Sequence, residues 1–205
     1  INDPTLKATG IRVALPQDEE QATVMLVLAA QLNDSVRYEN YIDDFINRFP
    51  TSTEGYNARA TRFFSRGQFN RADEMLQQEV KRAAKKDVAY SNYATMVYQA
   101  AVYRPDSTFT KWNLDKALEL SQQAEKLNPL PIYKHQQAQI LYAQGHYQQA
   151  LEIFTSLQPT ELGKNGEIYY EAAQCKMQLK APDADVMQLL DKAVQAQTGL
   201  ASAPY

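Results

Sequence analysis

The chain has 205 residues, of which 44% are apolar, and a formal net charge of −3. This length and apolar content suit one medium domain or a short array of repeats, and the small negative charge gives no basic surface for nucleic acid. The longest apolar run, residues 22–30, is far shorter than the roughly 20 residues that span a bilayer, so no direct membrane insertion is expected.

The first part of the chain shows no helical period. Residues 1–17 contain Pro4, Gly10 and Pro16, so we expect an extended lead-in. From residue 18 onward apolar residues recur at helical spacing, and the predicted helices come in pairs. In chain order the pairs are 18–32 with 35–48, 53–65 with 69–85, 87–103 with 113–127, 132–144 with 147–157, and 166–179 with 183–197.

Capping and breaking residues support these boundaries. Ser35 can cap the helix that begins there, and Pro50 stops it. Thr51 and Glu54 have the spacing of a capping box before the next helix. Gly67 separates that helix from its partner, because a left-handed turn is least costly at glycine.

An alanine-centred pattern repeats through the pairs. Glycine, an aromatic residue, alanine and a large apolar residue recur at matching spacing as Gly67, Phe69, Ala72 and Leu76, and as Gly145, Tyr147, Ala150 and Phe154. Alanine lets one helix backbone approach its partner, and a single pair cannot bury its apolar face alone, so the pairs are expected to stack.

The spacing of these alanines locates an insertion. Ala117 and Ala150 are 33 residues apart, whereas Ala72 and Ala117 are 45 apart. The excess falls where the helical period disappears, which predicts an inserted loop at 103–112 within the third repeat. Trp112, the only tryptophan, lies at the end of this loop, and we expect it to pack onto its own repeat.

A period near 34 residues with this pattern resembles the tetratricopeptide repeat (TPR) family. The resemblance covers residues 18–197 and implies an all-α fold, a right-handed α-α superhelix of about five helix pairs. The implied solenoid spans 18–199, with repeats at 18–50, 53–86, 87–129, 131–159 and 166–197, followed by a tail at 200–205.

In this architecture the first helix of each pair lines a concave face. The residues that this register turns inward, which are our candidates for peptide or ligand binding, are mostly aromatic and amide: Asn57, Phe64, Asn92, Tyr98, His135, Gln136, Gln139, Tyr142, Tyr169 and Tyr170. Aromatic rings and amides can hold an extended peptide by flat apolar contacts and hydrogen bonds. The alternative, that the rings simply pack between neighbouring helices, stays open. Phe64, Tyr98 and Tyr142 occupy equivalent positions, as in a ladder of aromatic rings.

Several kinds of chemistry are not expected. The chain has no nucleophile motif, phosphate-binding loop or zinc-binding helix motif, so we expect no enzyme activity. His135, His146 and Cys175 lack ligand spacing, which predicts no metal site and no cofactor. Members of the family that clamp a terminal carboxylate use lysine and arginine at two positions that Ile132 and Gln136 occupy here, which excludes that subtype.

The first helix differs from the last. Residues 22–30 are apolar on nearly every side, so this helix needs a cover, whereas the last helix has a polar face. We expect residues 11–15 of the lead-in to fold over the first helix; the alternative is that another chain or an upstream domain covers it.

The sequence therefore predicts a non-catalytic scaffold or peptide-binding module, with a protein or peptide partner and no nucleic acid. The alternative is a glycan- or small-ligand-binding helical module of an exported bacterial protein. The first residues, Ile1-Asn2-Asp3-Pro4, do not resemble a signal peptide, and we expect a chain processed or cut from a longer one. The compartment is left open, with the periplasm or cell envelope favoured over the cytoplasm.

Overall fold

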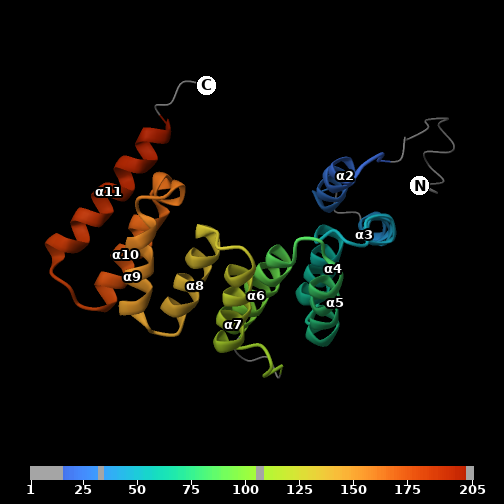
Figure 1. The fold of residues 1–205 in the computed structure, drawn as a ribbon, viewed down its shortest axis with the longest axis horizontal. Coiled ribbons are helices and arrows are strands. Elements are labelled where there is room, and N and C mark those ends of the chain that lie inside the picture. The colour runs from blue at the N-terminus through green and yellow to red at the C-terminus, as the bar shows by residue number, and fades with distance from the viewer. Residues whose placement is uncertain (1–15, 32–34, 105–108, 202–205) are drawn as a thin grey trace. The chain divides into compact units, whose positions relative to one another are not determined.

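The computed structural model describes residues 16–31, 35–104 and 109–201, which are largely helical and contain no strand. The helices, labelled as in Figure 1, are α2 (Glu19–Gln31), α3 (Ser35–Arg48), α4 (Glu54–Ser65), α5 (Phe69–Arg82), α6 (Lys86–Tyr103), α7 (Leu114–Leu127), α8 (Pro131–Ala143), α9 (Tyr147–Leu157), the 3-10 helix η1 (Glu161–Asn165), α10 (Glu167–Gln178) and α11 (Asp183–Ala201). The chain forms two compact units, residues 1–85 (unit 1) and 86–205 (unit 2). The predicted all-α class and the five helix pairs are confirmed.

Most helices begin and end close to their predicted positions. α5 ends before Ala83 rather than at residue 85, because Ala83 takes an extended conformation with a ψ of 137°. The N–H of Ala84 then donates to the carbonyl oxygen of Thr51 at 2.9 Å, which connects the end of unit 1 to the turn before α4. Gly67 has a φ of +71° at the predicted turn between α4 and α5, a conformation that glycine adopts without strain.

The predicted capping box of Thr51 and Glu54 is wrong. The box requires Thr51 to be the N-cap, but α4 begins at Glu54 and its N-cap is Thr53, which makes no side-chain cap hydrogen bond. The N–H of Glu54 donates instead to the hydroxyl of Ser52 at 3.3 Å. The helix therefore begins later than the spacing of the two residues suggested.

The terminal segments fall partly outside the described residues. Of the predicted lead-in at 1–17, Pro16 is buried, and its carbonyl oxygen accepts a hydrogen bond from the guanidinium of Arg48. At the other end, α11 continues through Gly199 to Ala201, so the helix end predicted at 197 is wrong and the predicted tail begins within the helix. A single glycine weakens a helix but does not end it.

Unit 1 consists of two helix pairs. Ala22 and Leu26 of α2 meet Ile42 and Phe45 of α3 in one buried cluster. α4 packs against both α3 and α5. The buried apolar residues of α4 and α5 are Tyr56, Ala60, Phe63, Ala72 and Leu76. Glu39 of α3 also forms ion pairs with three arginines, Arg59, Arg62 and Arg66.

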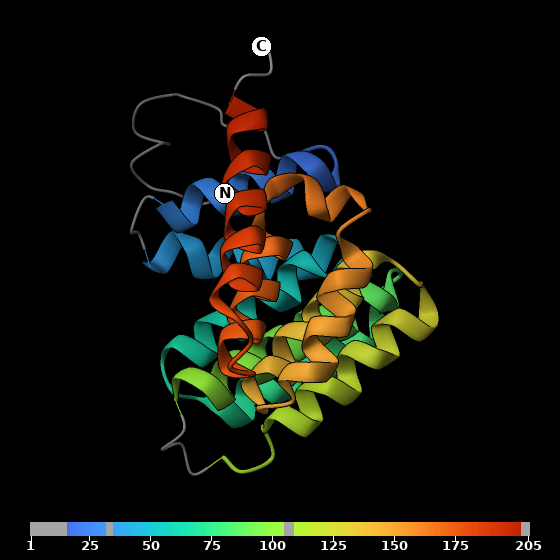
Figure 2. The ribbon, with the colours of Figure 1, turned by 90° about the vertical axis from the view of Figure 1, so that its left-hand side faces the viewer.

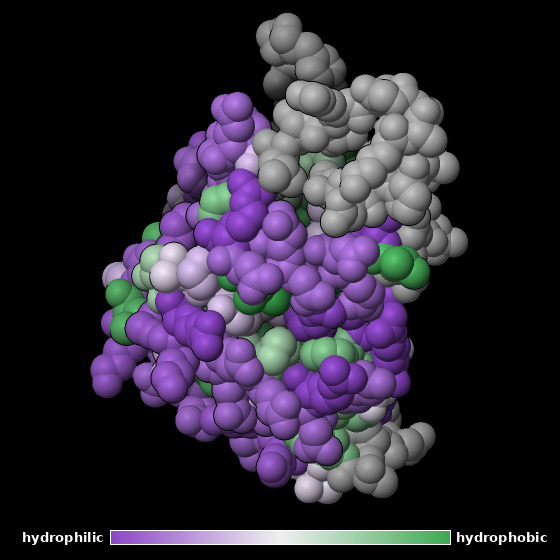
Figure 3. Space-filling view, turned by 90° about the vertical axis from the view of Figure 1, so that its right-hand side faces the viewer, coloured by the Kyte–Doolittle hydropathy of each residue, from purple (hydrophilic) through white to green (hydrophobic). Residues whose placement is uncertain are grey.

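α2 keeps part of its apolar surface exposed. Val24, Val27 and Leu28 are 53%, 52% and 49% exposed. Residues 11–15, which we expected to cover this helix, lie outside the described residues. Association through the first helix stays a prediction. On the face shown in Figure 3, apolar residues form small separate patches within a largely hydrophilic surface.

Unit 2 contains the other three pairs, α6 with α7, α8 with α9, and α10 with α11. Ala117 and Ala150, at the start of α7 and α9, are fully buried, as the repeat pattern predicted. The core of the last two pairs includes Leu141, Phe154, Leu157, Ile168, Ala172, Cys175, Val186 and Leu189. α11, red in Figure 2, closes this core by packing against α10 and η1. No described helix has the length and apolar character needed to cross a membrane.

The insertion in the third repeat follows α6. Residues 105–108 lie outside the described residues, and the chain is described again from Phe109. Trp112 is buried, and its ring lies 6.3 Å from that of Tyr93 and 5.4 Å from that of Phe109. The expectation that Trp112 packs onto its own repeat is confirmed.

Candidate functional site

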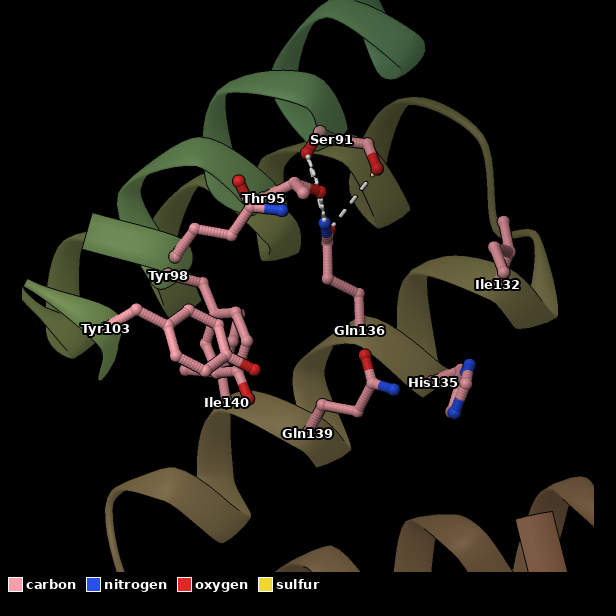
Figure 4. A pocket seen from close by; sticks show the side chains of 10 residues that line it. Ser91, Thr95, Tyr98, Tyr103, Ile132, His135, Gln136, Gln139 and Ile140 are labelled. Atoms are coloured by element: carbon pink, nitrogen blue, oxygen red, sulfur yellow. Dashed lines mark hydrogen bonds between the residues drawn. The ribbon is translucent and has the colours of Figure 1, made fainter. Parts of the chain in front are cut away.

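A pocket of about 330 Å³ lies between α6 and α8, within unit 2. Its lining residues, most of which are labelled in Figure 4, are Ser91, Thr95, Tyr98, Gln99, Tyr103, Ile132, His135, Gln136, Gln139 and Ile140. We call it the α6–α8 pocket. α6 and α8 are the first helices of two successive repeats, so the pocket is on the side of the repeats where binding was predicted.

Helical periodicity explains why these residues share one pocket. On α6, Thr95, Gln99 and Tyr103 follow one another at intervals of four residues, which places them on one face. On α8, Ile132, Gln136 and Ile140 do the same, with His135 and Gln139 beside them. Tyr103 and Ile132 are exposed, and they form part of the rim.

Gln136 joins α8 to α6 across the pocket through hydrogen bonds. Its Nε2 donates to the carbonyl oxygen of Ser91 at 3.0 Å and to Oγ1 of Thr95 at 2.8 Å, and its Oε1 accepts from Oγ of Ser91 at 3.3 Å. Figure 4 shows the amide pointing across from α8 to α6. Both N–H groups of the amide are used in these bonds, so Gln136 holds the wall rather than offering a donor to a ligand.

Gln139 and His135 both reach toward Glu171 of α10. Nε2 of Gln139 donates to Oε1 of Glu171 at 2.7 Å, and Nε2 of His135 makes a short contact with Oε2 of the same carboxylate. These contacts connect α8 with α10, the first helices of the fourth and fifth repeats. An amide has two N–H groups and an acceptor oxygen, so one bond to Glu171 leaves Gln139 the capacity to bind a ligand.

The hydroxyl of Tyr98 keeps its proton at neutral pH. Burial raises the pKa of Tyr98, and the side chains of Tyr103 and Glu171 raise this pKa further. A phenol that keeps its proton can donate a hydrogen bond. The pocket therefore combines the phenol of Tyr98, the amide of Gln139 with free capacity, and apolar surface from Ile140 and the tyrosine rings.

The predicted binding residues fall into two groups. Tyr98, His135, Gln136 and Gln139 line the α6–α8 pocket. The other six do not line it: Asn57, Phe64, Asn92, Tyr142, Tyr169 and Tyr170. Asn57 and Phe64 are on α4 in unit 1, and Asn92 is half-buried on α6.

Most of the aromatic rings outside the pocket pack within their own repeats. The rings of Phe64 and Phe69 lie 5.7 Å apart, and those of Tyr142 and Tyr147 lie 5.2 Å apart. Tyr142 and Tyr169 also pack against the buried core of unit 2. Tyr170 is 51% exposed on α10. For Phe64, Tyr142 and Tyr169 the structure shows ring packing, the alternative that the sequence left open, whereas Tyr98 lines a cavity.

Some residues of the site were missed by sequence reasoning. Tyr103 and Gln99 lie on the same face of α6 as Thr95, and this spacing could have identified them. Glu171 had no such signal, because the predicted register of this helix turned Tyr169 and Tyr170 inward instead.

No family model and no curated protein matches the chain. Solved structures do resemble it. YrrB, described as a TPR protein with an unusual peptide-binding site, is 14% identical with a TM-score of 0.56, and the match covers 95% of this chain and 91% of YrrB. PilF of Pseudomonas aeruginosa is 15% identical with a TM-score of 0.66, over 87% of this chain and 76% of PilF. MamA is 13% identical with a TM-score of 0.63, over 94% of this chain and 100% of MamA. The fold is therefore that of the TPR solenoids.

Proposed function

We propose that this protein is a non-catalytic interaction module that holds a short extended segment of a partner protein in the α6–α8 pocket. The observation that carries this proposal is the pocket itself, where the repeat architecture brings Tyr98, His135 and Gln139 together on the predicted binding side.

The size and lining of the pocket suit side chains of a peptide. A volume of about 330 Å³ lies at the lower end of the roughly 300–1,000 Å³ that small-molecule sites occupy. The rings of Tyr98 and Tyr103 and the side chain of Ile140 offer apolar contact. Gln139 can pair with a peptide backbone group, and aromatic rings lose little conformational entropy when they are covered.

The fold adds support of a general kind. YrrB, which shares the fold, is described as having a peptide-binding site. The alternative from the sequence, a module that binds glycans or small ligands, stays a prediction.

The test is a selection from a displayed library of random peptides, followed by titration calorimetry with the selected peptide. We expect Tyr98→Ala and Gln139→Ala to weaken binding at least tenfold, because each removes a central contact of the pocket. Tyr170→Ala is the matched control, since it removes an exposed tyrosine of the neighbouring α10 that lies outside the lining, and it should bind like the wild type.

Circular dichroism melts would first show that each variant keeps its fold. The proposal is wrong if no peptide is selected, or if Tyr98→Ala and Gln139→Ala bind the selected peptide as tightly as the wild type. A panel of oligosaccharides in the same calorimeter tests the glycan alternative.

A further inference from the structure

A histidine and two glutamates gather where α8 faces α10. Each of His135, Glu167 and Glu171 offers one ligand atom, and these atoms all lie within 4.8 Å of one another. His135 is 7% exposed, the side chain of Glu171 is 14% exposed, and Glu167 is open to solvent. The cluster thus has a buried side and an accessible side.

The positions of the two glutamates follow from the helix period. Glu167 and Glu171 are four residues apart on α10, so they lie on the same face, one turn from each other. Two negative charges at this spacing disfavour the helix unless a positive charge lies between them. Of the two glutamates, Glu171 is the one in contact with His135 of α8.

We propose that His135, Glu167 and Glu171 bind a divalent first-row transition metal, for which Zn²⁺ is the probe. One imidazole nitrogen and two carboxylate oxygens are a donor set that zinc accepts, and three protein ligands leave a coordination position for water or for a ligand. Bonds of about 2.0–2.2 Å place tetrahedral donors about 3.4 Å apart. The exposed side chain of Glu167 can rotate to reach this spacing.

Neighbouring residues orient the side chains of the cluster, as expected for a metal site. Gln139 donates to Oε1 of Glu171, which leaves Oε2 directed at His135. Hydrogen bonds of this kind orient metal-binding carboxylates in known sites. The ring of His135 is also fixed by packing, since it lies 5.9 Å from the ring of Phe154. The ring of His135 and the carboxylate of Glu171 are thus oriented before any metal binds, and Oε2 of Glu171 moves away from Nε2 of His135 to reach the spacing of metal ligands.

A purely structural role is distinguishable from metal binding through Glu167. If His135 and Glu171 form only an ion pair that joins α8 to α10, Glu167 has no part in it. Glu167→Gln therefore leaves that contact intact and removes a metal ligand. His135→Ala removes both the contact and a ligand, so its effect on metal binding is interpretable only together with that of Glu167→Gln.

The experiment uses the full chain, stripped with a chelator and titrated with Zn²⁺ at pH 7.4 against a chromophoric competitor. We expect one Zn²⁺ per chain with a dissociation constant of micromolar or below, and a rise in melting temperature with Zn²⁺. Glu167→Gln should weaken binding at least tenfold while its metal-free melting temperature matches that of the wild type. Co²⁺ should give a visible absorption band that the variant lacks.

Two variants serve as controls. His146→Ala removes the other histidine, which is exposed in the turn before α9, and Glu152→Gln removes an exposed carboxylate of α9. Both should bind Zn²⁺ like the wild type. The proposal is overturned if wild-type binding is weaker than about 100 µM, if Glu167→Gln binds as tightly as the wild type, or if His146→Ala loses binding.

Discussion

Asp87 joins three segments of unit 2 through two hydrogen bonds to one oxygen. Nδ2 of Asn128 and the hydroxyl of Tyr133 each donate to Oδ2 of Asp87 at 2.9 Å. The three residues belong to the start of α6, the end of α7 and the start of α8. This carboxylate therefore fixes how successive repeats of unit 2 meet, beside the turn that joins α7 to α8.

The hydrogen bond between Tyr133 and Asp87 shifts the pKa of both residues. Burial alone would raise the pKa of Asp87, but the hydrogen bonds from Asn128 and Tyr133 hold it below its usual value. Burial raises the pKa of Tyr133 to about 12, and the hydrogen bond to Asp87 contributes to that rise. The stability supplied by Asp87 is thus present above its unfolded pKa of about 3.9 and is lost as the pH falls through the lower folded value.

We expect Tyr133→Phe to lower the free energy of unfolding by about 1.5–3 kcal/mol at pH 7, because it removes a hydrogen bond to a charged group. The loss should stay constant from pH 7 down to about pH 5 and shrink as the pH falls further, through the unfolded pKa of Asp87 and then its lowered folded pKa. Urea unfolding across this range measures the difference, with Tyr170→Phe as the matched control at an exposed tyrosine. An equal loss at every pH would show that Asp87 is not the partner that matters.

The role of a single residue could be predicted from the sequence where the repeat pattern determines its position in the helix pair. The alanines at Ala72, Ala117 and Ala150 are fully buried because the repeat requires a close helix approach at each of them. The register of α8 likewise gave His135 and Gln139. Glu171 could not be found this way, since its place in the site depends on contacts from α8 that sequence spacing does not contain.

At the scale of elements, the short helix η1 is a connection in which Gly163 has no room for a side chain. η1 packs against α10 and α11, and Gly163 within it lies against the backbone of the segment after α9. A Cβ added at Gly163 would lie 2.1 Å from the carbonyl oxygen of Gln158, so no side chain fits without movement of the backbone. Residues 160–165 fell between the predicted repeats at 131–159 and 166–197, because a 3-10 turn has no apolar period.

We expect Gly163→Ala to destabilise the protein by about 3 kcal/mol, the upper end of the cost of overpacking, since the clash is with backbone rather than with a flexible side chain. Lys164→Ala, at an exposed position of the same element, should leave stability within about 0.5 kcal/mol. Thermal and urea unfolding compare the two. If both variants unfold alike, η1 is not packed as the structure has it.

Helix existence was easier to predict than helix ends. Apolar spacing and breaking residues placed every pair, yet the capping box at Thr51 did not form and α11 passed through Gly199. Capping depends on which of several neighbouring polar side chains reaches a free N–H, as Ser52 does at Glu54. That choice is made by the packing of the helix, which the local sequence does not determine.

At the scale of the whole molecule, the α6–α8 pocket and the His135 cluster both belong to unit 2. The buried core of the last two repeats is formed entirely within this unit. The residues proposed to bind a partner and a metal therefore depend on contacts among α6–α11. Unit 1 has its own buried cluster of α2 and α3.

A fragment of residues 86–205 is expected to fold alone, because repeat proteins are stabilised by contacts within and between adjacent repeats. Circular dichroism should show a helical spectrum and one cooperative melt. The fragment should also bind a peptide selected on the full chain with similar affinity. A fragment that is unfolded, although soluble, would mean that unit 2 needs residues 1–85 to fold.

The thiol of Cys175 is the one group of its kind in the chain, and it is fully buried in the last repeat. Burial raises its pKa to about 11, with a further contribution from Glu171. Since the thiolate is the reactive form, a colorimetric thiol reagent reaches it only when α10 separates from its neighbours. The rate of that reaction thus reports how often the C-terminal repeat opens transiently, and Cys175 allows this measurement without an introduced label.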